Sequence, residues 1–132
     1  NSNVILTPHI KEFERVLGRK ISNAIEDGRD FCRRTGAILH LKSSCSLTFS
    51  PSCDEILANI SLGSELAKGG SGDVLSGIAA AIVVGRDDLA RAVAEAAEVH
   101  RRTAHCLTER ENERSILASE IVQNLGKYLK NI

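Results

Sequence analysis

Apolar residues recur along this chain in short blocks whose spacing predicts alternating strands and helices. The first block, Val4-Ile5-Leu6, stops at Thr7-Pro8 and predicts a buried strand. A helix follows, for which we predict Thr7 as the cap and Pro8 in the first turn. This helix ends before Gly18, and its apolar positions share one face: Ile10, Phe13, Val16 and Leu17.

The middle of the chain changes from a helical period to a strand period. Residues 22–34 place apolar side chains on one helical face, although Gly28 interrupts the pattern, and Gly36 follows the predicted helix. Three short apolar or alternating runs come next, separated by turn-forming residues. They predict three consecutive antiparallel strands, at residues 37–41, 47–49 and 55–60.

The rest of the chain is predicted to be helical. The three helices span residues 73–84, 87–107 and 119–129, and Ser119 is the predicted cap of the last one. Strand and helix units followed by a run of helices indicate a layered α/β fold. A chain of 132 residues fits one domain by length, and a domain of this size buries roughly two thirds of its unfolded surface.

Composition and charge narrow the range of partners. Lysine plus arginine total 17 and aspartate plus glutamate total 17, so no global field attracts nucleic acid or an anionic membrane. No stretch approaches the about 18 apolar residues that span a bilayer, and the first residues lack the pattern of a secretory signal. We therefore expect a soluble, cytoplasmic protein that binds neither nucleic acid nor membrane. The four cysteines lack metal-ligand spacing, which argues against zinc.

Residues 63–77 carry the clearest chemical signal in the sequence. Three glycines, Gly69, Gly70 and Gly72, allow the backbone to approach a ligand closely and to adopt positive φ angles. The apolar residues that follow predict a buried helix, whose first amides have no partner within the helix and whose dipole favours an anion. The segment predicts a phosphate-binding loop that leads into a helix.

Asp73 stands at the start of that helix, where a carboxylate would repel a phosphate unless it had a role of its own. As a general base it could take a proton from a substrate hydroxyl while the neighbouring amides stabilise a phosphoryl group in transfer. Alternatively, Asp73 could cap the helix, and the spacing alone favours neither role. The loop matches neither the G-x-x-x-x-G-K-[ST] nor the G-x-G-x-x-G pattern.

Three segments together resemble the ADP-dependent NAD(P)H-hydrate dehydratases, the carbohydrate-kinase-like family within the ribokinase-like superfamily. Their order and spacing agree with that family, and the similarity runs from about Asn3 to the C-terminus. The segments are Gly69-Gly70-Ser71-Gly72-Asp73-Val74-Leu75-Ser76-Gly77, Thr7-Pro8-His9-Ile10-Lys11-Glu12-Phe13, and Leu41-Lys42-Ser43-Ser44-Cys45-Ser46. The resemblance implies the C-terminal part of a single ribokinase-like α/β/α domain over residues 1–132, because family members have a long portion before the T-P-H segment.

The resemblance also implies roles for individual residues. Asp73 would be the catalytic carboxylate and contact the substrate, and His9 would contact the hydrated nicotinamide nucleotide. The anion hole would consist of Gly70, Ser71 and Gly72. The nucleotide would be held by Gly72 together with Lys42, Ser43, Ser44, Cys45 and Ser46. Ser43 replaces a glycine of the family pattern and would be strained if that position needs a positive φ.

The implied reaction is the repair of NADH or NADPH that has taken up water, with ADP or ATP as co-substrate and Mg²⁺ as metal. Glu12 would be tied to magnesium and phosphate, as in related kinases. The implied partners are a second copy of the chain or a missing N-terminal portion, and an NAD(P)H-hydrate epimerase. Two alternatives stay open: a small-molecule kinase acting on a vitamin precursor or a sugar, which T-P-H in place of T-P-N disfavours, and a non-catalytic fragment.

Overall fold

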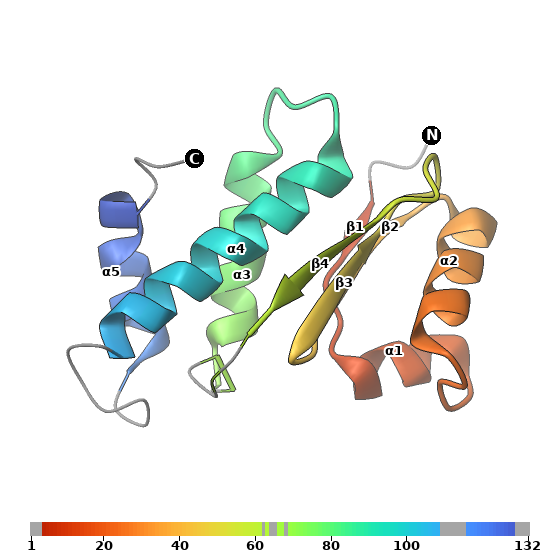
Figure 1. Cartoon of the computed structure of the whole chain (residues 1–132), viewed down its shortest axis with the longest axis horizontal. Coiled ribbons are helices and arrows are strands. Elements are labelled where there is room, and N and C mark those ends of the chain that lie inside the picture. Colours follow the sequence, from red (N-terminus) through yellow and green to blue (C-terminus); the bar gives the residue numbers. More distant parts are fainter. Residues whose placement is uncertain (1–3, 62, 64–65, 68, 109–115, 129–132) are drawn as a thin grey trace.

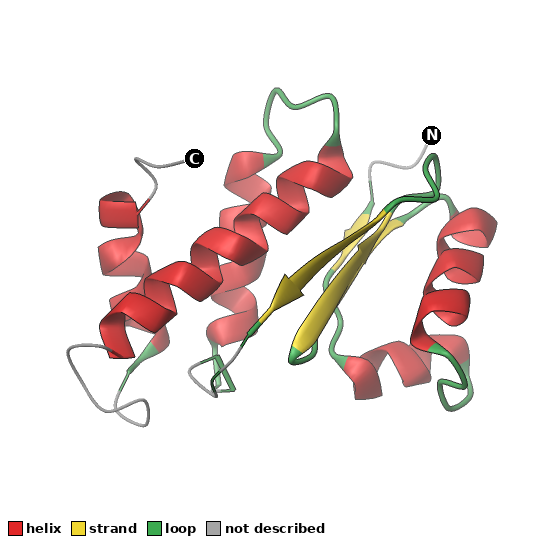
Figure 2. Ribbon diagram, in the orientation of Figure 1, coloured by secondary structure: helices red, strands yellow, loops and turns green. Residues whose placement is uncertain are grey.

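The chain folds into three layers, with helices on both sides of one sheet (Figures 1 and 2). The structure is a computed structural model that describes residues 4–61, 63, 66–67, 69–108 and 116–128. In chain order, its elements are β1 (Ile5–Leu6), α1 (Ile10–Leu17), α2 (Ala24–Thr35), β2 (Ile38–Leu41), β3 (Cys45–Phe49), β4 (Ile56–Ile60), α3 (Ser71–Ile82), α4 (Leu89–Thr108) and α5 (Ala118–Tyr128). Within these ranges no helix combines the length and the apolarity needed to cross a bilayer.

The sheet has the strand order β1-β2-β3-β4. Strand β1 pairs with β2 in parallel, and the α1–α2 segment connects them, as a parallel pair requires. Strands β2, β3 and β4 pair antiparallel in sequence order, which confirms the predicted strand sequence and orientation. The predicted helices are also confirmed, with boundaries that differ by a few residues.

The two faces of the sheet differ because side chains alternate along each strand. One face is apolar: Leu39, Leu41 and Phe49 are buried there against Phe13 of α1 and Phe31 of α2. The two phenylalanines of the helices meet edge to face, with ring centroids 5.3 Å apart. One hydrophobic core therefore lies between this face of the sheet and helices α1 and α2.

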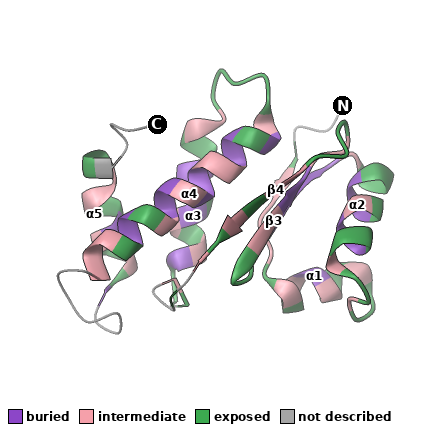
Figure 3. Cartoon of the chain, in the orientation of Figure 1, coloured by how far each residue is buried: buried purple, intermediate pink, exposed green. Residues whose placement is uncertain are grey.

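The opposite face of the sheet lies under α4 and carries polar side chains next to Ile38 and Leu57. His40 of β2 and Thr48 of β3 are direct partners across the ladder, and their side chains are hydrogen-bonded at 2.8 Å. Asn59 of β4 donates through Nδ2 to the carbonyl oxygen of Ala94 in α4. Helices α3 and α4 pack against each other beside this layer through small and branched residues, among them Leu75, Ile78, Ala96, Ala97 and Val99, and Figure 3 shows these buried faces.

Two predicted helix starts are wrong. The cap of α1 is His9 rather than Thr7, so Pro8 precedes the helix instead of lying in its first turn. Helix α5 begins at Ala118, so Ser119 lies inside it, and Glu120 accepts the N–H of Leu117 at 2.6 Å instead. Thr7 and Ser119 are residue types that often cap helices, but in the structure other residues stand at these two helix starts.

Glycines end or adjust the first two helices. Gly18 and Gly36 terminate α1 and α2 with φ angles of 70° and 72°, as their positions in the sequence predict. Gly28 lies inside α2, where a Cβ would come within 2.6 Å of Cζ of Phe49. The glycine that interrupts the helical pattern therefore lets α2 pack directly on the ring of Phe49.

Candidate active site

A cavity of about 970 Å³ gathers residues from the ends of β1 and β2, the start of α3 and the middle of α4. Its size is typical of small-molecule sites. The predicted site residues that line it are His9, Glu12, Lys42, Ser43, Ser44, Ser46, Gly70, Ser71, Gly72 and Asp73. Cys45 does not line the cavity, because the alternation of β3 puts it on the face opposite to Ser46. Its place in a nucleotide site stays a prediction.

The start of α3 forms the anion-binding part of this cavity. Its N-cap is Gly70, with a φ of 82° that residues other than glycine rarely adopt. The amides of Ser71, Gly72 and Asp73 therefore form the first turn of the helix, and such amides have no partner inside a helix. The geometry favours an anion at this point.

Asp73 is exposed in the cavity and its carboxylate accepts no hydrogen bond from any residue that the structure describes. The capping interpretation is therefore wrong, because the cap position belongs to Gly70. A carboxylate at this position is free to accept a proton from a bound hydroxyl. Of the two roles that the spacing left open, the geometry supports the general base.

Lys42 brings a positive charge to the same helix start. Its backbone N–H donates to the carbonyl oxygen of Pro8 at 2.8 Å, which ties the end of β2 to the segment before α1. A Cβ added to Gly72 would lie 3.0 Å from Nζ of Lys42, so a side chain there would contact the ammonium. No described carboxylate forms an ion pair with Lys42. The ammonium and the helix amides together suit a phosphate.

Serine side chains hold the turn between β2 and β3. Oγ of Ser46 accepts the N–H of Ser43 at 3.2 Å and donates to its carbonyl oxygen at 3.0 Å. Among the described residues every positive φ belongs to a glycine, so Ser43 is not left-handed. The serine in place of the family glycine therefore causes no backbone strain here.

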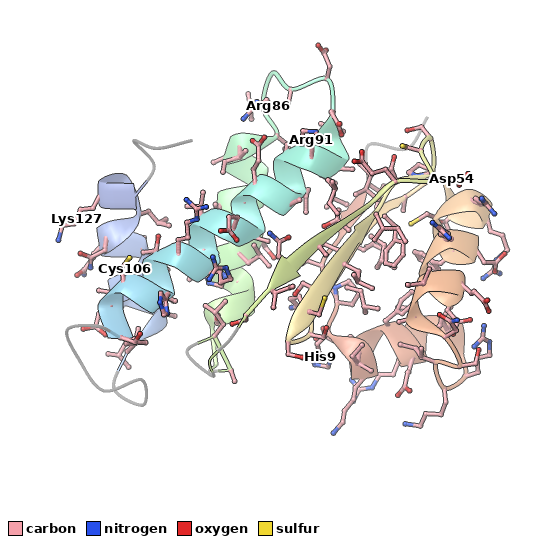
Figure 4. The ribbon with its side chains drawn as sticks, in the orientation of Figure 1. His9, Asp54, Arg86, Arg91, Cys106 and Lys127 are labelled. Carbon is pink, nitrogen blue, oxygen red and sulfur yellow. The ribbon has the colours of Figure 1, made fainter. Side chains whose placement is uncertain are left out.

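His9 and Glu12 form a reciprocal capping box at the start of α1. Nδ1 of His9 accepts the N–H of Glu12 at 3.1 Å, and Oε2 of Glu12 accepts the N–H of His9 at 2.8 Å. The hydrogen bond from the backbone of His9 lowers the pKa of Glu12, to which the nearby charges of His9 and Lys42 add. Figure 4 shows His9 at the start of α1, close to the edge of the sheet at which β3 begins.

The cavity is also lined by two buried histidines, His40 and His100, which the sequence pattern did not single out. His40 bonds Thr48, and Nε2 of His100 lies 3.3 Å from Oγ of Ser71. Burial, with the positive charge of Lys42 as a further cause, lowers the pKa of each to about 4. His40 could have been found because it lies two positions before Lys42, the residue that directly follows β2. No local signal identifies His100.

The described residues contain no group of three or more histidine, cysteine, aspartate or glutamate side chains that could hold a metal ion. The carboxylate of Glu12 already serves its capping box. Mg²⁺ commonly keeps several waters and binds through one or two carboxylates plus substrate phosphates. The residues therefore do not fit a metal site made by protein alone, and a role of Glu12 toward magnesium stays a prediction.

Comparison with known proteins places this geometry in a family. A family model described as NAD(P)H-hydrate dehydratase matches residues 1–127. The ADP-dependent (S)-NAD(P)H-hydrate dehydratase of Neisseria meningitidis serogroup B is 34% identical over 134 residues, which cover 98% of this chain and 45% of that protein. The bifunctional NAD(P)H-hydrate repair enzyme Nnr of Methanopyrus kandleri is 31% identical over 132 residues, which cover 96% of this chain and 26% of that protein.

Solved structures agree with this result. The ADP/ATP-dependent NAD(P)H-hydrate dehydratase from Bacillus subtilis co-crystallized with ATP/Mg²⁺ is similar with a TM-score of 0.87 and 28% identity, over 97% of this chain and 47% of that chain. A ribokinase-like superfamily protein from Enterococcus faecalis matches with a TM-score of 0.80 at 24% identity, over 97% and 44% of the two chains, and confirms the predicted fold class. The chain spans about half the length of these solved relatives or less. It belongs to the NAD(P)H-hydrate dehydratase family.

Proposed function

We propose that the protein to which this chain belongs dehydrates hydrated NADH or NADPH at the expense of ADP or ATP. The observation that carries the proposal is that Asp73, Lys42 and the start of α3 line one cavity together with His9. A base, a cation and a row of free amides are the groups that phosphoryl transfer to a hydroxyl requires. The names of the relatives supply the substrate and the nucleotide.

The proposed sequence of steps uses these groups in order. Asp73 takes the proton of the ring hydroxyl, whose oxygen attacks the terminal phosphorus of the nucleotide, and the bond to the departing nucleotide breaks. Lys42 and the amides of Ser71 and Gly72 stabilise the charge on the phosphoryl oxygens. The ring C–O bond then breaks with its electron pair on phosphate, a proton leaves the adjacent carbon, and the ring double bond reforms. Phosphorylation thus converts a poor leaving group into a good one.

Mg²⁺ would neutralise charge on the nucleotide phosphates when bound with them. The relative co-crystallized with ATP/Mg²⁺ supports this part of the proposal. The two bifunctional relatives from Methanopyrus kandleri and Vibrio cholerae suggest that an epimerase cooperates with the dehydratase. That this chain is the C-terminal part of one domain also remains a proposal.

The test is the absorbance at 340 nm of the protein given chemically hydrated NADH, magnesium and either ADP or ATP. A nucleotide-dependent rise that Asp73→Asn abolishes is the expected result. The assay is run on this chain and on the longer parent protein, because the relatives are about twice as long. Consumption of nucleotide with a phosphorylated product and no rise would instead indicate the small-molecule kinase, and no reaction in the parent protein would overturn the proposal.

A further inference from the structure

The side-chain amide of Asn59 has a buried oxygen that no other group of the chain uses. Among the residues that the structure describes, Oδ1 of Asn59 and Nε of Arg29 are the buried side-chain atoms without a hydrogen-bond partner. Arg29 lies on α2 and does not line the cavity, whereas Asn59 lines it. Buried polar atoms are nearly always paired, because an unpaired one has lost its hydrogen bond to water without replacement. An unpaired acceptor in the cavity wall predicts a donor on a ligand.

Helix α4 sets the orientation of this amide. Nδ2 of Asn59 donates to the carbonyl oxygen of Ala94 at 3.2 Å. A backbone carbonyl can only accept hydrogen bonds, so the nitrogen of the amide and not its oxygen must face α4. Oδ1 is on the other branch of the planar amide and is held there without a bond of its own. The side chain therefore offers an acceptor in a fixed position.

Asn59 lies in one row with two residues that are expected to hold the nucleotide. It is the direct partner of Ser46 on β3. Lys42 comes two positions after His40, so alternation places it on the same face of the sheet as Ser46. Lys42, Ser46 and Asn59 all line the cavity. Neighbouring strands lie about 4.8 Å apart, which places Asn59 about 10 Å from Lys42 along the row.

A nucleotide bound as proposed would extend along this row. Its phosphates would lie between Lys42 and the start of α3, where the ammonium and the free helix amides meet. The ribose and base are long enough to reach from there to β4. They carry hydrogen-bond donors, namely the ribose hydroxyls and the exocyclic amine of adenine. Phosphate oxygens are acceptors at neutral pH, so the partner of Oδ1 has to come from the nucleoside.

We propose that Asn59 is a specificity-determining residue whose Oδ1 accepts a hydrogen bond from the nucleoside, through the adenine amine or a ribose hydroxyl. The identity of the ligand rests on the proposed function, whereas the unpaired acceptor follows from the contacts of Asn59 alone. A ligand that lacks this donor leaves Oδ1 unpaired and binds more weakly. If the amine is the donor, Asn59 discriminates adenine from a base that has a carbonyl group in its place.

The first test compares nucleotides by calorimetry with the longer parent protein. The probes are ADP, IDP, in which a carbonyl replaces the amine, and the 2′-deoxy and 3′-deoxy forms of ADP, which each lack one ribose hydroxyl. We expect one of these analogues to bind about tenfold more weakly than ADP. In Asn59→Leu, ADP itself should bind about tenfold more weakly, and that analogue should lose no further affinity. Asn124→Leu makes the same change on α5, outside the cavity, and should keep the affinity for ADP.

Two outcomes of this comparison would overturn the proposal. One is that the unmodified protein binds the analogues as tightly as ADP, or binds none of the four nucleotides. This outcome is decisive even if Asn59→Leu does not fold. The other is that the difference between ADP and the weaker analogue persists in Asn59→Leu.

The second test observes the amide directly and needs no substitution at the site. The protein is labelled with ¹³Cγ-asparagine and titrated with ADP, and the Asn59 carbonyl carbon should shift downfield when Oδ1 accepts a hydrogen bond. Asn23 is the reference and should not shift, because its Oδ1 already accepts the N–H of Ile25 at 3.0 Å. A constant Asn59 signal at saturating ADP would contradict the proposal. Both expected results without dehydration of hydrated NADH would refute only the proposed function.

Discussion

Nε2 of His100 lies 3.3 Å from Oγ of Ser71, which joins the middle of α4 to the first residue of α3. Both residues are buried, at 3% and 4% exposure. The pKa of His100 is lowered to about 4 by burial and by Lys42, so the ring is neutral at pH 7. A neutral His100 holds the first turn of α3 in place through Ser71 without adding a second positive charge near Lys42.

This burial predicts how stability depends on pH. The pKa of His100 is about 4 in the folded chain and 6.5 when exposed, so the unfolded chain binds more protons between these values. The contribution is fully present above pH 6.5 and is lost as the pH falls toward 4. We expect a loss of about 3 kcal/mol in the free energy of unfolding, measured by urea denaturation between pH 7.5 and 4.5.

His40 shares this shift and faces the same lysine, so the two losses overlap instead of adding fully. His100→Gln should flatten the profile, whereas the exposed His105→Gln should leave it unchanged. A profile that is flat between pH 6.5 and 5 in the unmodified chain would contradict the buried neutral state. Asp27, whose pKa is lowered by its ion pair with Arg19, contributes only at lower pH.

Asp73→Asn should abolish turnover and leave the fold intact. The Asp73 carboxylate forms no hydrogen bond or ion pair with a residue that the structure describes. The substitution therefore removes the base without removing a structural contact. We expect kcat to fall about a thousandfold and the melting temperature to stay within about 2 °C. Asp30→Asn makes the same change on the exposed surface of α2 and should leave kcat unaltered. Retention of most activity in Asp73→Asn would exclude the general-base role.

Lys42→Ala should weaken binding of ADP, because it removes the ammonium beside Gly72. A lost charge-assisted contact predicts an affinity about tenfold lower or more by calorimetry. The control is Lys127→Ala, which removes the same charge at the far end of the molecule (Figure 4). Equal affinities of the two variants would show that Lys42 does not contact the nucleotide.

Gly28→Ala should destabilise the chain, since the added Cβ would meet the ring of Phe49 at 2.6 Å. Overpacking of this kind costs about 1–3 kcal/mol and is measurable by urea denaturation. Gly126→Ala places the same methyl group in helix α5, where nothing lies within 4 Å, and should stabilise by about 0.5–1 kcal/mol. If both variants changed stability in the same direction, the close contact between α2 and Phe49 would not be the cause.

The sheet was predictable from sequence because its strands are short apolar or alternating runs bounded by turn-forming residues. The glycine loop was predictable because three glycines precede an apolar helical segment. The cap of α1 was not predictable. Thr7 has the right chemistry for a cap, but its Oγ1 lies 3.3 Å from Oγ of Ser76, 69 residues later. A contact at that separation competes with the local one, and no local pattern reveals it.

The same limit explains why His100 could not be selected from the sequence. His100 contacts Ser71 across 29 positions, and its spacing to His105 excludes only a helical metal pair. Family resemblance selected His9, Lys42 and Asp73 as site residues, and all three line the cavity. His100 supports the start of α3 through Ser71, and this role could be identified only from the packing of α4 in the structure.

The β2–β3 turn has a second consequence, which concerns strand alignment. The bonds between Ser43 and Ser46 fix which residue of β2 faces which residue of β3. A slip of one position would move His40 into the apolar core and Leu41 under α4. A nucleotide bound to this turn would therefore also stabilise the alignment of β2 with β3. This stabilisation would slow amide hydrogen exchange along both strands. Changes that loosen the turn would cost alignment and affinity together.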